Sequence, residues 1–150
     1  MKKFVYNSTI GKIYICETNN KISHVSFFDN IEADIEETPL IKETYQQLCE
    51  YFNKTRKKFD IPLYLDGTEF QIKVWKALQN IEYGKTVSYG EIAKFINSPK
   101  AFRAVGNANN KNKIAIIIPC HRVIGSNGDL TGYAGGLNIK KYLLELEQSR

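Results

Sequence analysis

Apolar and polar positions alternate through the first part of the chain, a spacing typical of β-strands. Gly11 and the pair Asn19–Asn20 interrupt this alternation, and an Asn-Asn pair suits a two-residue hairpin turn. The pattern therefore predicts three short strands, Lys3–Tyr6, Gly11–Glu17 and Lys21–Phe28.

The spacing becomes helical after Pro39, where apolar residues recur every three or four positions. This pattern predicts a helix over Leu40–Phe52 that Pro39 opens. The acidic stretch Asp29–Thr38 is expected to be a loop, and Phe59–Leu65 a further extended segment.

Helical patterns dominate the rest of the chain, beginning after a turn at Asp66–Gly67. Thr68 and Gln71 have the spacing of a capping box. Ser98 followed by Pro99 is a helix start signal, with Ser98 as N-cap. We expect four helices: from Thr68 to about Asn80, Thr86–Ile96, Lys100–Asn109 and Leu137–Gln148.

These patterns predict an α+β protein of two domains. Residues 1–62 form a small N-terminal sheet-plus-helix domain. Residues 63–150 form a mainly helical domain, in which the helices around Ser98–Pro99, joined by a turn of three or four residues, make a helix-turn-helix.

One apolar run, Ile114–Ile118, is predicted to cross the interior and to end at Pro119. Cys120, His121 and Arg122 follow at once. A thiolate is the nucleophilic form of cysteine, and neighbouring positive charge lowers the thiol pKa from about 8.5. Cys120 is therefore a candidate nucleophile, although an isolated Cys-His-Arg triplet is more often a core cysteine near a surface pair.

The three cysteines are too widely spaced for a disulfide framework or a structural zinc site, so no metal is expected. Cys16 and Cys49 are expected to be packing residues. With no long apolar run and no signal-peptide pattern, the sequence indicates a reducing, cytoplasmic setting (nuclear in a eukaryote) and no membrane contact.

The net charge of +5 lies in one part of the chain. Residues 1–62 carry nine basic and nine acidic side chains, and no acidic residue occurs between Glu91 and Asp129. This gap is either a solvated basic face or a surface for a polyanion such as nucleic acid. Its basic residues are Lys94, Lys100, Arg103, Lys111, Lys113 and Arg122.

Two segments near these cations are rich in small residues. The helix predicted over Lys100–Asn109 carries Ala104 and Gly106, which either pack tightly against a neighbouring helix or allow close approach to a nucleic-acid backbone. Five glycines in residues 125–136 predict an irregular loop whose backbone can pass close to a ligand.

The second half of the chain resembles the O6-alkylguanine-DNA alkyltransferases. A Pro-Cys-His-Arg signature together with an Arg-Ala-Val-Gly helix is highly specific for that family. The shared motifs are Phe70-Gln-x-x-Val-Trp75, Val87-Ser-Tyr-Gly90, Arg103-Ala-Val-Gly106, Asn112, Ile118-Pro-Cys-His-Arg-Val123, Gly132-Tyr-Ala-Gly-Gly136 and Glu147.

The resemblance implies a single-turnover DNA repair protein that moves the alkyl group of O6-alkylguanine, and of O4-alkylthymine, onto Cys120. His121 would deprotonate Cys120 through a water, and Glu147 would orient the imidazole. Asn112 would link the recognition helix to the active-site turn, and Tyr89 would protonate the departing guanine.

The resemblance also implies a monomer that binds double-stranded DNA, needs no cofactor and extrudes the damaged base. Arg103 would fill the space that the base leaves. The other residues implied in DNA binding are Tyr89, Lys100, Ala104, Gly106 and Arg122, and those implied in the substrate pocket are Trp75, Val123, Tyr133 and Ala134. Because many relatives carry serine in place of Ala134, a hydroxyl contact to O6 is absent here.

Two other classes compete with this interpretation, and a third, a cysteine hydrolase, is conceivable. A non-catalytic sensor of alkylated DNA replaces the cysteine, usually with tryptophan, so Cys120 argues against it. A helix-turn-helix regulator would need polar base-reading side chains where Lys100–Asn109 carries alanine and glycine. A cysteine hydrolase has no substrate-binding motif to support it.

Overall fold

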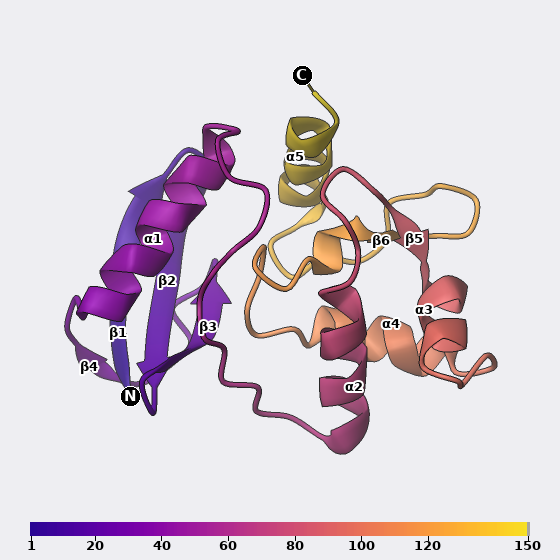
Figure 1. Cartoon of the computed structure of the whole chain (residues 1–150), viewed down its shortest axis with the longest axis horizontal. Coiled ribbons are helices and arrows are strands. Elements are labelled where there is room, and N and C mark those ends of the chain that lie inside the picture. Colours follow the sequence, from indigo (N-terminus) through magenta and orange to yellow (C-terminus); the bar gives the residue numbers. More distant parts are fainter. Residues whose placement is uncertain (150) are drawn as a thin grey trace. The chain divides into compact units, whose positions relative to one another are not determined.

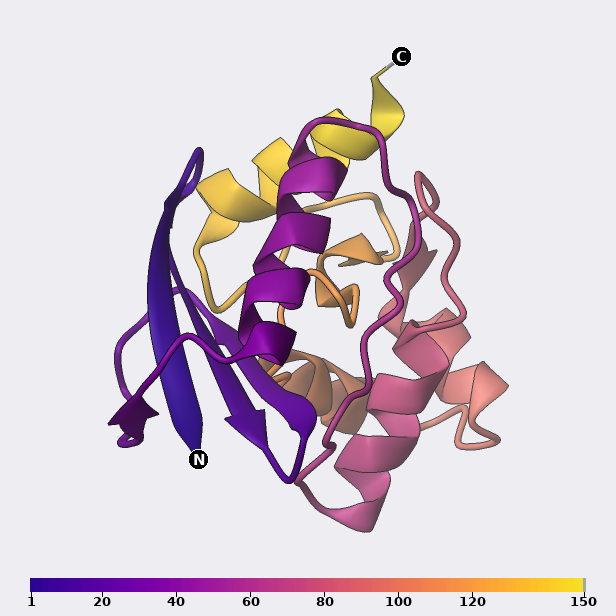
Figure 2. The same ribbon diagram turned by 60° about the vertical axis from the view of Figure 1, so that its left-hand side comes forward.

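The computed structural model describes residues 1–149, which form two compact units. The first contains residues 1–65 together with 113–115, and the second contains residues 66–112 and the chain from 116 onward. Figures 1 and 2 show a sheet with one helix in the first unit and a mainly helical second unit, which confirms the expected α+β class.

The first unit is built on a four-stranded sheet in the order β3-β2-β1-β4. Strands β1 (Lys2–Ser8), β2 (Gly11–Thr18) and β3 (Lys21–Ser26) are antiparallel neighbours, as their alternating pattern predicts. Asn19 and Asn20 both have positive φ, 53° and 62°, which is the backbone of a type I′ hairpin. The two-residue turn is thus confirmed.

One prediction for this unit needs correction. The segment Asp29–Thr38 is not all loop, because Asp34–Ile35 (β4) pairs in parallel with β1. The expected extended segment Phe59–Leu65 is not a strand of the sheet, but its Leu63 makes a parallel bridge with Ile22. Both outcomes depend on pairing with distant strands, which local patterns do not record.

Helix α1 (Pro39–Phe52) covers the sheet of the first unit (Figure 1). The Thr38 hydroxyl accepts a hydrogen bond from the amide of Ile41 at 3.1 Å, and Pro39 supplies a first position that needs no donor. The predicted start at Pro39 is confirmed. Buried residues at helical spacing anchor the helix: Ile41, Thr44, Gln47, Leu48 and Tyr51.

The second unit contains four helices among its described residues: α2 (Glu69–Leu78), α3 (Tyr89–Phe95), α4 (Phe102–Asn110) and α5 (Leu137–Gln148). Strand β5 (Val87–Ser88) runs beside and parallel to β6 (Val123–Ile124) (Figure 1). The capping box of α2 forms as predicted, with Thr68 and Gln71 bonding each other's backbone amides.

The helix expected over Thr86–Ile96 begins three residues late, at Tyr89. Val87 and Ser88 pair with Val123 and Ile124 instead. Ser88 then serves as N-cap, and its hydroxyl accepts from the amide of Glu91 at 3.1 Å. A β-branched valine fits a strand well, and the partner strand lies far away in sequence.

The next helix also begins later than expected. Ser98 is not its N-cap, because α4 starts at Phe102 and the amide of Ala101 donates to the carbonyl of Ser98 at 2.9 Å. Residues 96–101 therefore separate α3 from α4, a longer turn than predicted, and Asn97 adopts a positive φ of 61° within it.

The apolar run Ile114–Ile118 is buried along most of its length but forms no strand. Ile114 makes an isolated bridge with Val25 of the first unit, to which residues 113–115 belong. Ile116 then has φ of 71°, a conformation that β-branched residues rarely adopt. This strained step redirects the chain toward Pro119.

Trp75, which the resemblance implies in the substrate pocket, is a buried residue of the second unit. It is buried in α2, and its indole N–H donates to the carbonyl of Ala108 in α4 at 2.8 Å.

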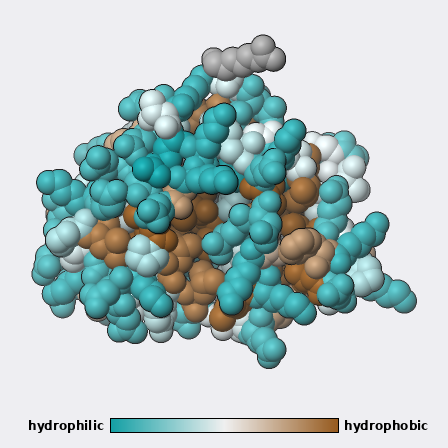
Figure 3. Space-filling model, in the orientation of Figure 1, coloured by the Kyte–Doolittle hydropathy of each residue, from teal (hydrophilic) through white to brown (hydrophobic). Residues whose placement is uncertain are grey.

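Hydrophilic residues cover most of the face shown in Figure 3. Within residues 1–149, no helix is both long and apolar enough to cross a membrane.

We predict that Gly67→Ala destabilises the protein. A Cβ on Gly67 would lie 2.6 Å from the buried ring of Trp75, which cannot move without repacking the core; such overpacking costs about 1–3 kcal/mol. Urea unfolding followed by circular dichroism measures the change. In the control, Gly90→Ala, the new Cβ is no closer than 3.8 Å to Ser88, so stability should not fall. Equal midpoints for wild type and Gly67→Ala would contradict the prediction.

Candidate active site

Cys120 begins a single 3₁₀ turn, Cys120–Arg122, directly after Pro119. Cys120 is 6% exposed. Two amide side chains, one near the end of α4 and one just after it, fix the backbone around Cys120. The Asn112 side chain donates to the carbonyl of Ile118 at 2.9 Å, and the Asn109 side chain donates to that of Cys120 at 3.3 Å.

Burial raises the pKa of the Cys120 thiol to about 11, because a thiolate loses its hydration there. A hydrogen bond from Asn112 and the positive charge of Lys140 act in the opposite direction and lower that pKa. The resting cysteine is therefore a protonated thiol, and its ionisation requires a base and a nearby cation.

The pair His121–Glu147 has the chemistry that such a base requires. The imidazole Nε2 donates to a Glu147 carboxylate oxygen at 2.6 Å, and both side chains are buried. Burial lowers the pKa of His121, which favours the neutral ring, although Glu147 opposes this shift. With the proton on Nε2, Nδ1 presents a lone pair, and this buried atom has no hydrogen-bond partner in the structure.

Arg122 was expected to contact DNA, and the structure corrects this. The side chain is buried, and its guanidinium holds Glu147 through two hydrogen bonds of 2.8 and 3.0 Å. A third bond, 2.7 Å long, reaches the carbonyl of Ile81. Arg122 is thus the internal counter-ion of Glu147, a use of arginine that its fork of donors favours.

The same carboxylate also holds the segment before β5. The amide of Gly84 donates to Glu147 at 3.1 Å, and the side chain of Gln148 donates to the carbonyl of Gly84 at 2.6 Å. The end of α5 therefore fixes both the turn that carries Cys120 and the segment that leads to Tyr89.

Lys140 is a buried residue that the sequence analysis missed. Its ammonium donates to the carbonyls of Val123 and Thr131, both at 2.7 Å. Burial lowers the pKa of Lys140, and Cys120 raises it when its thiol is ionised. A sequence signal exists: Lys140, Leu143 and Glu147 have the spacing of one helix face. Asn109 carries no comparable signal.

Of the other expected pocket residues, Val123 is hydrogen-bonded to this lysine, while Tyr133 and Ala134 lie on the glycine-rich loop, residues 125–136. Val123 is buried. Lys140 also binds Thr131 in the glycine-rich loop, and the Thr131 hydroxyl forms a 2.6 Å hydrogen bond with that of Tyr89. Burial raises the pKa of Tyr133 well above its ordinary value. Ala134 is exposed on the same loop.

The exposed side of α4 carries the other predicted DNA-binding residues. Arg103 and Ala104 are exposed there, as is Lys100 in the preceding turn. Gly106 lies against Tyr89, since a Cβ on this glycine would be 3.8 Å from the phenol ring. The helix thus presents one long cation beside small residues. Within residues 1–149 no cluster of three His, Cys, Asp or Glu side chains is arranged to hold a metal.

A buried cysteine beside a histidine–carboxylate pair is an arrangement suited to nucleophilic chemistry, and the exposed Arg103 on α4 is suited to an anionic partner. Two family models cover nearly the whole chain. The ribonuclease-like domain of 6-O-methylguanine DNA methyltransferase matches residues 1–65, and the DNA binding domain of the same protein matches residues 69–149.

Relatives with curated names agree with the family models. The methylated-DNA–protein-cysteine methyltransferase of Methanosarcina acetivorans is 50% identical over 97% of each chain. The constitutive enzyme of Bacillus subtilis is 45% identical over 93% of this chain and 90% of its own. The crystal structure of Mycobacterium tuberculosis OGT in complex with DNA matches with a TM-score of 0.92 and 43% identity, covering 99% of this chain and 93% of that one. This chain therefore belongs to the 6-O-methylguanine DNA methyltransferase family.

We predict that Glu147→Gln lowers the free energy of unfolding by about 3 kcal/mol. The substitution leaves the buried Arg122 cation without its counter-ion, which is costly where water cannot replace it. Urea denaturation of the two proteins measures the difference. Glu145→Gln is the control on the same helix, because Glu145 is exposed and lies 4.0 Å from Lys141. If both variants unfold with wild-type midpoints, Glu147 is not the counter-ion on which the site depends.

Proposed function

We infer that this protein repairs O6-alkylguanine in DNA by moving the alkyl group irreversibly onto Cys120, once per molecule. The observation that carries this function is the buried hydrogen bond between His121 and Glu147. His121 directly follows Cys120 on the same 3₁₀ turn. Family membership supports the same reaction, as do relatives named methylated-DNA–protein-cysteine methyltransferases.

In the proposed reaction, the lone pair on Nδ1 of His121 receives the thiol proton, by way of a water. Glu147 stabilises the resulting imidazolium through its short bond to Nε2. The sulfur then attacks the alkyl carbon, a sulfur–carbon bond forms, and the bond from that carbon to O6 breaks. The electron pair stays on the guanine, and no cofactor is consumed.

Tyr89 is proposed to give a proton to the departing guanine, which makes it a better leaving group. Its hydroxyl is hydrogen-bonded to that of Thr131 in the glycine-rich loop. This loop and Tyr89 can therefore together line the base pocket, with Tyr133 and Ala134 as further lining residues. Asn112 is proposed to couple α4 to the active-site turn through its bond to Ile118.

The damaged base must leave the duplex to reach a buried thiol. We propose that α3 and α4 act as a helix-turn-helix, with α4 in the minor groove and Arg103 filling the space of the extruded base. The small residues Ala104 and Gly106 permit that close approach. A DNA complex is known for the Mycobacterium tuberculosis OGT, which supports double-stranded DNA as the partner here.

Lys140 is proposed to be a positioning residue for this reaction. It ties Val123, three residues after the nucleophile, to Thr131 of the glycine-rich loop, and its charge lowers the pKa of Cys120. We also propose a cytoplasmic location, where the three free thiols remain reduced.

Intact-mass spectrometry after incubation with a duplex containing O6-methylguanine tests the function. We expect a gain of one methylene, limited to one per molecule and mapped to the peptide of Cys120. Cys120→Ser should bind the methylated duplex but gain no mass. Binding by wild type without a mass gain would favour a non-catalytic sensor, and a gain on Cys16 or Cys49 would assign a different nucleophile.

We predict that Lys140→Met slows transfer and moves the rising limb of the pH–rate profile to higher pH. Removing a cation raises the pKa of Cys120, so less thiolate is present at a given pH. Single-turnover rates with free O6-benzylguanine measure the shift. Lys140→Gln keeps a donor without the charge, so its pH–rate profile should shift in the same direction.

The neighbouring Lys141 provides the control, because its side chain is exposed and Lys141→Met should leave the profile unchanged. Circular dichroism establishes that each variant is folded before its rate is compared. An unshifted profile in folded Lys140→Gln would reject a role for the charge.

A further inference from the structure

Phe102 is an exposed aromatic residue that the fold does not explain. It is the first residue of α4, and 50% of its surface is exposed. The residues that anchor α4 to the second unit lie further along: Val105, Ala108 and Asn109. Because helical side chains lean toward the N-terminus, the Phe102 ring projects beyond the first turn of α4.

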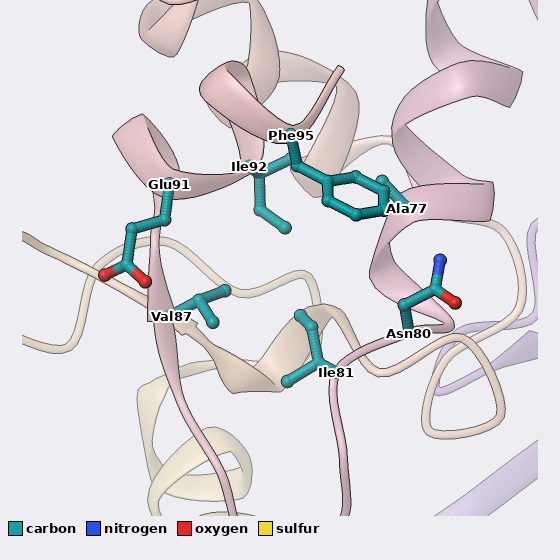
Figure 4. Close-up of a pocket in the computed structure, with 7 residues that line it drawn as sticks. All are labelled: Ala77, Asn80, Ile81, Val87, Glu91, Ile92 and Phe95. Carbon is teal, nitrogen blue, oxygen red and sulfur yellow. The ribbon is translucent and has the colours of Figure 1, made fainter. Parts of the chain in front are cut away.

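A second exposed phenylalanine, Phe95 on α3, has a different setting. Its ring points toward Ala77 and lines an apolar hollow of about 220 Å³ between α2 and α3 (Figure 4). Phe95 therefore has a packing role at the rim of this hollow even though it is 62% exposed. It provides a natural comparison for Phe102 within the same unit.

The ring of Phe102 lies beside the side chain proposed to enter the duplex. The guanidinium carbon of Arg103 is 5.9 Å from the centre of the ring, within the range of a cation–π contact. Successive base pairs are about 3.4 Å apart, so this separation spans fewer than two base steps. A helix that places Arg103 in the base stack thus brings Phe102 to a neighbouring step.

The charge of the chain segment that contains Phe102 favours a polyanion with apolar faces over a protein surface. Lys94, Lys100 and Lys111 lie on the same two helices or directly beside them, and no acidic residue occurs between Glu91 and Asp129. Charge complementarity and continuity with Arg103 both indicate duplex DNA.

We propose that Phe102 acts as an apolar wedge that packs against a base step next to the extruded nucleotide, while Arg103 occupies the vacated position. The inference rests on the function proposed above. Apolar side chains that enter the minor groove partly unstack a step, and they lower the cost of the distortion that extrusion requires. Phe102 would therefore help to open the duplex and take no part in the transfer of the alkyl group.

The test compares single-turnover transfer from an O6-methylguanine duplex with transfer from free O6-benzylguanine. Phe102→Ala should slow the duplex reaction about tenfold, the scale of one lost stacking contact, and leave the free-base reaction unchanged. Phe95→Ala is the matched control and should leave both rates unchanged. Fluorescence of 2-aminopurine placed next to the lesion should show less unstacking with Phe102→Ala than with wild type.

Further variants separate a wedge from a residue that merely holds Arg103. Phe102→Leu keeps apolar volume but loses the ring, so it should retain most of the duplex activity. The loss of affinity in Phe102→Ala should not change with salt, whereas Arg103→Ala should reduce the salt dependence of binding.

Several results would overturn the wedge. These are equal losses on both substrates, an equal effect of Phe95→Ala, a Leu variant as slow as the Ala variant, or no effect of Phe102→Ala on the duplex reaction. The proposed function has a separate control, because its failure would appear as the absence of transfer by wild type.

Discussion

The carboxylate of Glu147 is the constraint on which the rest of the second unit depends. A buried anion must be compensated, and here Arg122, His121 and the amide of Gly84 all donate to it. These groups come from a 3₁₀ turn and from the segment before β5. One charge near the end of α5 therefore fixes the turn that begins with Cys120, the tautomer of His121 and the path toward Tyr89.

A second constraint connects this site to the exposed helix α4. Asn109 and Asn112 bond the backbone around Cys120, and Trp75 holds the same end of α4 through Ala108. The helix proposed to contact DNA is thus rigidly connected to the thiol. Such preorganisation matters for a displacement in which the attacking atom must meet one carbon of an extruded base.

Burial of the nucleophile has a cost and a function. Desolvation raises the pKa of Cys120, which suppresses the thiolate and protects it from unrelated electrophiles. Lys140 and Asn112 lower this pKa again, and neutral His121 provides a proton acceptor. A site of this kind suits a protein that reacts once, because premature alkylation of Cys120 would consume the molecule.

The sequence by itself determined the α+β class, the hairpin at Asn19–Asn20, helix α5 and the candidate nucleophile Cys120, since local turn chemistry, helical periodicity and a specific motif carry these features. Only the tertiary structure decided that Arg122 pairs internally and that Lys140 reaches the site. The sequence pattern around a basic residue is the same whether its side chain faces solvent or a buried partner. Burial of the side chain depends on contacts between segments that are distant along the chain.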